Sequence, residues 1–370
     1  MSVLFDETEI NGMTIQNRFV RSATWEGMSS DQGRCSKELV EFTVDLARGG
    51  VGLIVMGHTY VQENGKATPR QTGVYEDDLV DSLRSLPEEV HKYGSKVAIQ
   101  LSHSGGNTNQ EWMPLPIIGP SPFINRFENK VREMTLKEIE EVVNAFGQAA
   151  RRCVEAGFDA IQIHSAHGYL NNQFLSPYWN KRKDAYGGPL ENRARLLFEI
   201  TQRIREEVGN KIPLLVKINS EDFVEGGLSL SDTIWICRKL PALGIDAIEV
   251  SGGCRDAGED LMPIRKGIKK AAQEAYFIKQ ASSIKQAVSV PVILVGGVRS
   301  FDVAEQIISD GKADYIALSR PLIREPHLIR RWRSGDRSKA KCLSDNKCLD
   351  MAYEDQPVHC VVEKAKKGER

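Results

Sequence analysis

Short apolar runs recur along the chain, and amphipathic segments separate most of them. Each run has four or five residues and is typical of a strand buried on both faces. Strands that alternate with helices predict a parallel sheet with helical crossovers, and eight of them favour an α/β fold of the (β/α)8 TIM-barrel type. The eight runs are residues 19–22, 52–56, 97–101, 160–163, 214–218, 247–250, 292–295 and 315–318.

A doubly wound sheet is the alternative architecture. No Gly-x-Gly-x-x-Gly motif follows an early strand, and no change of composition marks a linker between two halves. The glycine motif and the division into two halves, which are absent here, are typical of that fold when it binds a dinucleotide. The barrel therefore ranks first, with residues 1–335 as the barrel domain and residues 336–370 as a C-terminal extension that carries cysteines.

Turn signals mark both ends of the predicted barrel. Glycines at 49–50, 94, 157, 244 and 311 come just before strands, where the end of a helix needs a cap. Asn11-Gly12 predicts a β-hairpin over residues 5–17, which we expect to plug the barrel floor. Residues 102–135 and 252–273 form long loops, expected to wall a substrate pocket, and Thr135 with Glu138 predicts a capping box.

Composition narrows the classes of function. Hydrophobic residues make up 41% and charged residues 27% of 370, as in an ordinary globular protein. A net charge of −1 provides no basic field for nucleic acid or a membrane. The N-terminus lacks the features of a signal peptide, and no apolar run approaches the ~18 residues of a membrane span. We expect a cytoplasmic protein whose first four cysteines are reduced thiols.

The strand predicted at residues 160–163 ends in a group of polar and aromatic residues. His164, His167, Gly168 and Tyr169 follow it, at the end of a parallel strand where ligands bind. Two imidazoles three residues apart can both donate hydrogen bonds to a carbonyl oxygen that gains negative charge. Two other interpretations are open: histidines whose hydrogen bonds are satisfied within the fold, and a metal site, for which no third ligand is evident.

The same stretch carries a long motif. It reads His164-Ser-Ala-His-Gly-Tyr-Leu170, Gln173-Phe-Leu-Ser-Pro177, Asp184-Ala-Tyr-Gly-Gly188 and Glu191-Asn-Arg193. In this, residues 159–195 resemble the flavin-dependent ene-reductases of the old yellow enzyme family, the NADH:flavin oxidoreductases, and the likeness extends over residues 3–335. The resemblance implies FMN at the barrel mouth, NAD(P)H as reductant, and reduction of the C=C bond of an α,β-unsaturated carbonyl compound or enoyl thioester. It assigns the substrate carbonyl to His164 and His167, and proton delivery to Tyr169.

Several strand ends carry residues suited to a flat cofactor with a phosphate tail. Gly296 and Gly297 follow the seventh strand, and Ser319 and Arg320 follow the eighth, where this fold commonly holds phosphate. A generic glycine-rich turn, or the phosphate site of an aldolase or isomerase, has the same pattern.

The residues that would face the ring of such a cofactor are more specific. Gln100 has the donor and the acceptor that match a pyrimidine amide edge. Lys217 is costly to bury without an anion, and we expect the negative charge of a reduced flavin to be its partner. By likeness to the family, the FMN contacts are Ala23, Thr24, Gly57, Gln100, Lys217, Gly297 and Arg320.

The chain departs from the family at two positions of the predicted site, Trp25 and Lys217. Most relatives have Arg where Lys217 stands, so its contact is expected to be single rather than forked. Trp25 replaces a small polar residue and is expected to narrow the substrate pocket or to stack near the flavin; the alternative is packing beside the N-terminal hairpin.

The C-terminal extension carries Cys342-x-x-Asp345-x-x-Cys348, followed by Cys360. This resembles the four-cysteine iron–sulfur motif of the dienoyl-CoA reductase branch, with Asp345 in place of the second cysteine. Two interpretations are open: an iron–sulfur cluster held by three cysteines and Asp345, or a relic with free thiols.

Other functions on the same barrel also stay open. With a cluster, the chain is alternatively an electron-transfer or catalytic subunit of an iron–sulfur flavoprotein complex that an electron-donor protein supplies. A flavin-dependent oxidative demethylase is another alternative, and a barrel that binds only a phosphate ligand is a third. In each case we expect a homo-oligomer.

Overall fold

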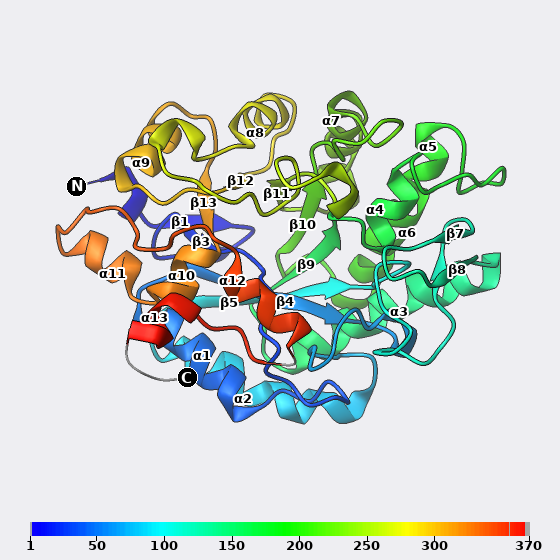
Figure 1. The fold of residues 1–370 in the computed structure, drawn as a ribbon, viewed down its shortest axis with the longest axis horizontal. Coiled ribbons are helices and arrows are strands. Elements are labelled where there is room, and N and C mark those ends of the chain that lie inside the picture. The colour runs from blue at the N-terminus through cyan, green and yellow to red at the C-terminus, as the bar shows by residue number, and fades with distance from the viewer. Residues whose placement is uncertain (1, 355, 367–370) are drawn as a thin grey trace.

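The computed structural model of the protein describes residues 2–354 and 356–366. Eight parallel strands form its centre: β3 (Phe19–Arg21), β4 (Leu53–Tyr60), β5 (Lys96–Ser102), β9 (Ala160–Ser165), β10 (Leu214–Asn219), β11 (Ala247–Ser251), β12 (Val292–Val295) and β13 (Tyr315–Leu318). They close into a barrel in the order β10-β11-β12-β13-β3-β4-β5-β9 (Figure 1). Because this sheet is closed, the structure confirms the predicted TIM barrel and excludes the doubly wound alternative.

Every predicted strand coincides with an observed one, and β4 differs most. It runs to Tyr60 rather than ending at Met56, and its register against β5 shifts between Val55 and His58. A shift of this kind re-aims the side chains that follow it. Gly57 and His58 therefore belong to the strand and lie at its mouth end.

Helices surround the barrel (Figure 1). Side chains at their starts explain several of the boundaries: Ser36, Thr135 and Ser229 each accept a hydrogen bond from a backbone N–H in the first turn. Both bonds of the predicted Thr135–Glu138 capping box are present. The helices are α1 (Lys37–Arg48), α2 (Val80–His91), α3 (Leu136–Glu155), α4 (Leu170–Leu175), α5 (Leu190–Arg193), α6 (Arg195–Val208), α7 (Leu230–Lys239), α8 (Ile278–Lys285), α9 (Phe301–Ser309), α10 (Arg320–Arg324), α11 (Leu328–Arg333), α12 (Lys347–Asp350) and α13 (Val361–Lys366).

The N-terminal hairpin plugs the barrel floor, as predicted. Its strands β1 (Thr8–Ile10) and β2 (Met13–Ile15) pair around Asn11 and Gly12, whose φ angles of 43° and 77° suit a two-residue hairpin turn. Ile10, Met13 and Ile15 pack in one apolar cluster with the inward-facing residues of the barrel. The hairpin is shorter than predicted because residues 3–5 form a 3-10 turn.

Three turns beneath the barrel share one arrangement. Each has an aspartate shortly after a glycine, and the carboxylate accepts a hydrogen bond from a backbone N–H at the start of the neighbouring strand while it also pairs with a basic side chain. The three sets are Asp159 with Val97 N at 2.9 Å and Lys96, Asp246 with Leu214 N at 2.8 Å and Arg205, and Asp314 with Val292 N at 2.8 Å and Lys285.

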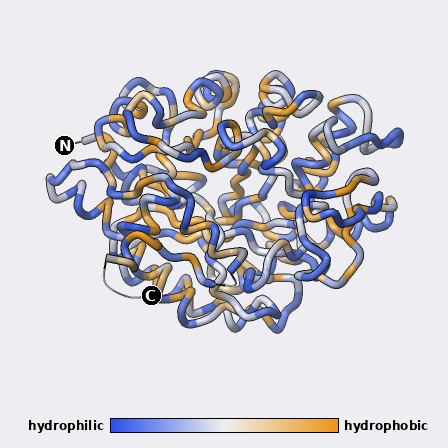
Figure 2. Tube along the Cα trace, in the orientation of Figure 1, coloured by the Kyte–Doolittle hydropathy of each residue, from blue (hydrophilic) through white to orange (hydrophobic). Residues whose placement is uncertain are grey.

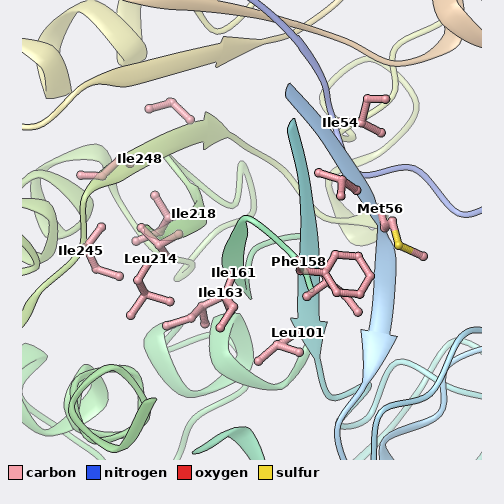
Figure 3. Packing of buried hydrophobic residues seen from close by; sticks show 14 of the residues in the cluster. Ile54, Met56, Leu101, Phe158, Ile161, Ile163, Leu214, Ile218, Ile245 and Ile248 are labelled. Atoms are coloured by element: carbon pink, nitrogen blue, oxygen red, sulfur yellow. The ribbon is translucent and has the colours of Figure 1, made fainter. Parts of the chain in front are cut away.

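Side chains of each barrel strand point alternately toward the helices and toward the interior. Figure 3 shows part of the outward-facing layer, with Ile161 and Ile163 of β9 near Leu214 and Ile218 of β10. The inward-facing residues near the floor are apolar: Ala98, Ala160, Leu215 and Ala247. Two residues further along the same strands, a polar interior layer is formed by Gln100, Gln162, Lys217 and Glu249.

The two long loops lie where the sequence predicts them, but one contains strands that were not predicted. Within residues 102–135, β6 (Ile118–Gly119), β7 (Phe123–Ile124) and β8 (Lys130–Glu133) form a three-stranded sheet. Strands of two to four residues are too short to show a periodic pattern. Residues 252–273 contain short 3-10 turns at Arg255–Ala257 and Ala271–Gln273.

The C-terminal segment returns to the barrel (Figure 1, red). Val358 N donates to Glu26 O at 2.7 Å, and Gly267 N donates to Ser344 O at 2.9 Å. Residues 355 and 367–370 of the predicted extension lie outside the described residues. Hydrophilic residues are prominent on the peripheral loops and turns (Figure 2). No helix in the described ranges is long and apolar enough to cross a membrane.

Candidate active site

A cavity opens at the carboxyl ends of the barrel strands, as the fold predicts. The strands β3, β5, β9 and β10 bring residues from distant parts of the sequence to its wall. Nine residues predicted for the site line it: Ala23, Thr24, Trp25, Gln100, His164, His167, Tyr169, Lys217 and Ser319.

The polar interior layer forms the base of this cavity. Gln100 Nε2 donates to Gln162 Oε1 at 2.7 Å, and Gln162 Nε2 donates to Glu249 Oε2 at 2.9 Å. Ser22 Oγ donates to Glu249 Oε1 at 2.6 Å and accepts from Lys217 Nζ at 2.8 Å. The amides of Gln100 and Gln162 are thereby held in one orientation, which leaves Gln100 Oε1 as the outer acceptor.

Lys217 has its anion partner within the chain. Its Nζ lies 3.1 Å from Glu249 Oε1, and both side chains are buried. Glu249 is this partner because β10 and β11 pair in register at Lys217 and Glu249, and both side chains face the interior. The expected contact between Lys217 and a reduced flavin stays a prediction.

Three predicted catalytic residues form one cluster. The ring centroid of His164 lies 5.2 Å from that of His167 and 4.7 Å from that of Tyr169. Burial lowers the pKa of His164 well below its ordinary value, and the charges of His167, Lys217 and His58 lower it further. Burial, then Lys217 and His58, lowers the pKa of His167 in the same way. Both imidazoles are therefore neutral at neutral pH.

The conformation of His167 is unusual for a residue with a side chain. Its φ of 63° lies in the left-handed region. Two bonds hold it there: its N–H donates to Asn219 Oδ1 at 3.1 Å, and its Nε2 lies 2.7 Å from Ser251 Oγ. Strain of this kind persists only where the surroundings over-determine it.

The predicted phosphate residues come together beside the main cavity. Gly297, Ser319 and Arg320 line one smaller cavity, and Ser319 belongs to both. A Cβ on Gly297 would lie 2.7 Å from the ring of Tyr276, so glycine is needed at this position. Gly296 supports the turn behind it, since its carbonyl accepts from Tyr276 N.

The guanidinium of Arg320 is held by two other segments. Its Nη1 donates to Arg265 O at 2.9 Å and to Asn346 Oδ1 of the C-terminal segment. Asn346 Nδ2 in turn donates to Ile264 O at 2.9 Å. The C-terminal segment therefore orients the arginine predicted to bind the phosphate.

The structure places Gly57 apart from the cavity wall. Its N–H donates to Glu26 Oε1 at 2.9 Å, and a Cβ there would lie 2.1 Å from Glu26 Oε2. Glu26 pairs with Arg21 at 2.8 Å. Gly57 thus donates to Glu26 and leaves room for its carboxylate in this buried ion pair. Trp25, in contrast, lies on the cavity wall rather than beside the N-terminal hairpin.

The cysteines of the extension gather at one place. Cys342, Asp345, Cys348 and Cys360 line a small cavity with Arg320. Burial, with the charge of Cys342, raises the pKa of the Cys348 thiol to about 12. Across the described ranges, no three His, Cys, Asp or Glu side chains are arranged to hold a metal ion. The four predicted ligands thus line one cavity, and the cluster and the relic both stay predictions.

Several side chains of the site were not predicted from the sequence. Gln162 and Glu249 lie two residues beyond inward-facing alanines, so strand alternation was the signal that would have found them. His58 lies beyond the predicted end of β4, after the register shift. Leu349 and Ala352 of the C-terminal segment also line the cavity.

The mouth fits a flat, hydrogen-bonding cofactor with a phosphate group. Trp25 Nε1 and His164 Nδ1 are buried polar atoms that have no partner in the described part of the chain, and a bound group is expected to satisfy such atoms. Gln100 and Lys217 offer an acceptor and a donor at the base, and Gly297 keeps the adjoining phosphate cavity open.

Comparisons with known proteins agree with this fit. The sequence model of the NADH:flavin oxidoreductase / NADH oxidase family matches residues 3–339. The chain is 35% identical to an NADH oxidase of Thermoanaerobacter brockii over 347 residues, which are 93% of this chain and 52% of that protein. It is 36% identical to an NADPH dehydrogenase of Clostridium acetobutylicum, over 88% of this chain and 93% of that protein.

A solved structure of a 2-naphthoyl-CoA reductase with 2-naphthoyl-CoA superposes with a TM-score of 0.90 at 27% identity, covering 97% of this chain and 56% of that one. The chain thus spans about half the length of this reductase and of the NADH oxidase. The family match covers nearly the whole chain and confirms the family predicted from the histidine motif. The chain belongs to the NADH:flavin oxidoreductase / NADH oxidase family, whose cofactor is FMN.

Proposed function

We propose that this protein is an FMN-dependent NAD(P)H oxidoreductase that reduces the C=C bond of α,β-unsaturated carbonyl compounds, including enoyl thioesters. One observation carries the proposal: two neutral imidazoles and a tyrosine face one cavity with the predicted cofactor residues. Family membership supports the redox chemistry, and the likeness to a reductase that binds an aromatic thioester supports the substrate class.

His164 and His167 are the proposed donors to the substrate carbonyl oxygen. A neutral imidazole donates a hydrogen bond without giving up its proton, so it stabilises negative charge as that charge develops on the oxygen. Ser251 and Asn219 hold His167 in position before substrate arrives. This preorganisation lowers the cost of reorienting the donor during the reaction.

Tyr169 is the proposed proton donor to the α-carbon. It lies directly beside His164, so the carbonyl that His164 binds brings the adjacent carbon close to the phenol. FMN, when bound, supplies the hydride for the β-carbon and is reduced again by NAD(P)H. The π bond is thus replaced by two C–H bonds, one from the hydride and one from the Tyr169 proton.

The test starts from the visible spectrum of the purified protein and the flavin it releases on denaturation. We expect the denatured protein to release FMN. In the absence of oxygen, NADH or NADPH should reduce the bound flavin, and cyclohexenone but not cyclohexanone should reoxidise it. A protein that carries no FMN, or whose reduced form no unsaturated carbonyl compound reoxidises, would overturn the proposal.

A further inference from the structure

A third imidazole lines the same cavity as the two predicted catalytic histidines. His58 of β4 is 9% exposed and lines the same cavity as His164 and Tyr169. Its ring centroid lies 6.4 Å from that of His164 and 5.1 Å from that of Tyr169. The mechanism proposed above does not use it.

The tautomer of His58 follows from its neighbour Gln71. Ala67 N donates to Gln71 Oε1 at 2.7 Å, and because a backbone N–H can only donate, this end of the amide is the oxygen. The other end, Nε2, donates to His58 O at 2.9 Å and lies 2.7 Å from His58 Nδ1. His58 Nδ1 is therefore an acceptor, and the neutral ring carries its proton on Nε2.

This Nε2–H is a donor without an assigned acceptor. Burial lowers the pKa of His58 to about 4, so the ring is neutral at neutral pH. Gln71 contacts Nδ1 and the main-chain carbonyl of His58, and His58 Nε2 makes no hydrogen bond to the described residues. Gln71 is itself buried, which holds the donor in a fixed direction.

We propose that His58 is a specificity-determining residue that donates a third hydrogen bond to the substrate. The preferred substrates then have a second carbonyl group attached to the C=C bond, whose oxygen accepts this hydrogen bond. The inference rests on the proposed function. A carbonyl oxygen has two lone pairs, and His164 with His167 use both, so a third donor requires a second acceptor. Cyclic ene-diones and unsaturated diesters have this chemistry.

The experiment compares two substrates with one ring skeleton, ketoisophorone and the trimethylcyclohexenone that lacks its second carbonyl. In His58→Phe we expect kcat/KM for the dione to fall roughly threefold to tenfold, the effect of one neutral hydrogen bond, with the mono-enone unchanged. His58→Gln retains an N–H donor and should recover part of the loss. His91→Phe, at an exposed histidine of α2, is the matched control and should change neither value.

Binding provides a second measurement that needs no turnover. Hydroxybenzaldehyde has a second acceptor that phenol lacks, so His58→Phe should weaken binding of the aldehyde and leave phenol unchanged. If His58→Phe slows both substrates equally, His58 positions Tyr169 instead and the inference is wrong. An unchanged ratio in both His58 variants also overturns it. A wild-type protein that reduces neither substrate contradicts the proposed function itself.

Discussion

The aspartates at the floor of the barrel and several polar groups at its mouth differ in how they are paired. At the floor, Asp159, Asp246 and Asp314 each bind a backbone N–H and a basic side chain. At the mouth, buried polar atoms have no partner in the described part of the chain, among them Trp25 Nε1, His164 Nδ1 and Ser220 Oγ. Satisfied groups stabilise the fold, whereas unsatisfied ones cost free energy unless a ligand binds them.

Between the two ends, the polar interior layer shares features of both. Lys217 and Glu249 are fully paired, as at the floor, yet Lys217 also lines the cavity. The comparison therefore predicts that floor variants change stability alone, mouth variants change catalysis alone, and variants of the polar interior layer change both.

The largest effect is expected in the polar interior layer. Glu249→Gln leaves Lys217 as an unpaired buried charge and should lower the free energy of unfolding by about 3–5 kcal/mol. Urea unfolding measures this, and the double variant with Lys217→Met should recover most of the loss. If Glu249→Gln is as stable as the wild type, the pair does not carry this role.

A mouth variant should separate catalysis from folding. His164→Ala removes one donor to the substrate oxygen and should slow enone reduction by about 10²–10³-fold. FMN content and the urea midpoint should stay at wild-type values. An unchanged rate with cyclohexenone would refute the assignment of His164.

A floor variant should show the reverse. Asp314→Ala leaves the Val292 N–H without its acceptor, and about 1–3 kcal/mol of stability should be lost, with kcat unchanged per folded molecule. Asp310→Ala, at an exposed carboxylate nearby, is the control and should alter neither quantity. Loss of activity in folded Asp314→Ala would break the division between the two ends.

Acidification should act mainly through the mouth. The folded pKa of His58 is about 4 against an ordinary value of 6.5, so between these values the unfolded chain binds the extra proton. The contribution of His58 to the free energy of unfolding is therefore complete only well above pH 6.5, and it falls with pH by about 1.4 kcal/mol at pH ~5.5. The free energy of unfolding should depend less steeply on pH in His58→Phe than in the wild type. An equal slope in the two proteins would contradict a neutral His58 ring in the folded state.

The smallest effect concerns the cysteine cavity. We predict that protein prepared without oxygen contains FMN but no iron or acid-labile sulfide, because no three His, Cys, Asp or Glu side chains among the described residues are arranged to hold a metal ion. Asp345→Cys restores a fourth thiolate and tests whether the site takes up a cluster. Iron and sulfide in the wild-type protein would instead support the cluster interpretation, with Asp345 as a ligand.

Much of the barrel was accessible from local pattern. The runs at 292–295 and 315–318 match β12 and β13 residue for residue, since four apolar residues between turn signals specify a buried strand. Asn11-Gly12 and the Thr135–Glu138 box likewise act through neighbouring residues only. The histidine motif predicted that His164, His167 and Tyr169 lie together, because all three fall within six residues at one strand end.

Tertiary structure decided which distant groups meet. Lys217 and Glu249 face each other only because β10 and β11 pair in register inside a closed barrel. His58 lies in the site because of a register shift between β4 and β5 that no local sequence pattern predicts. The contact with Gln71 then determines its tautomer. Strand periodicity is a property of neighbouring residues, whereas partners across a barrel depend on register and closure, which involve the whole chain.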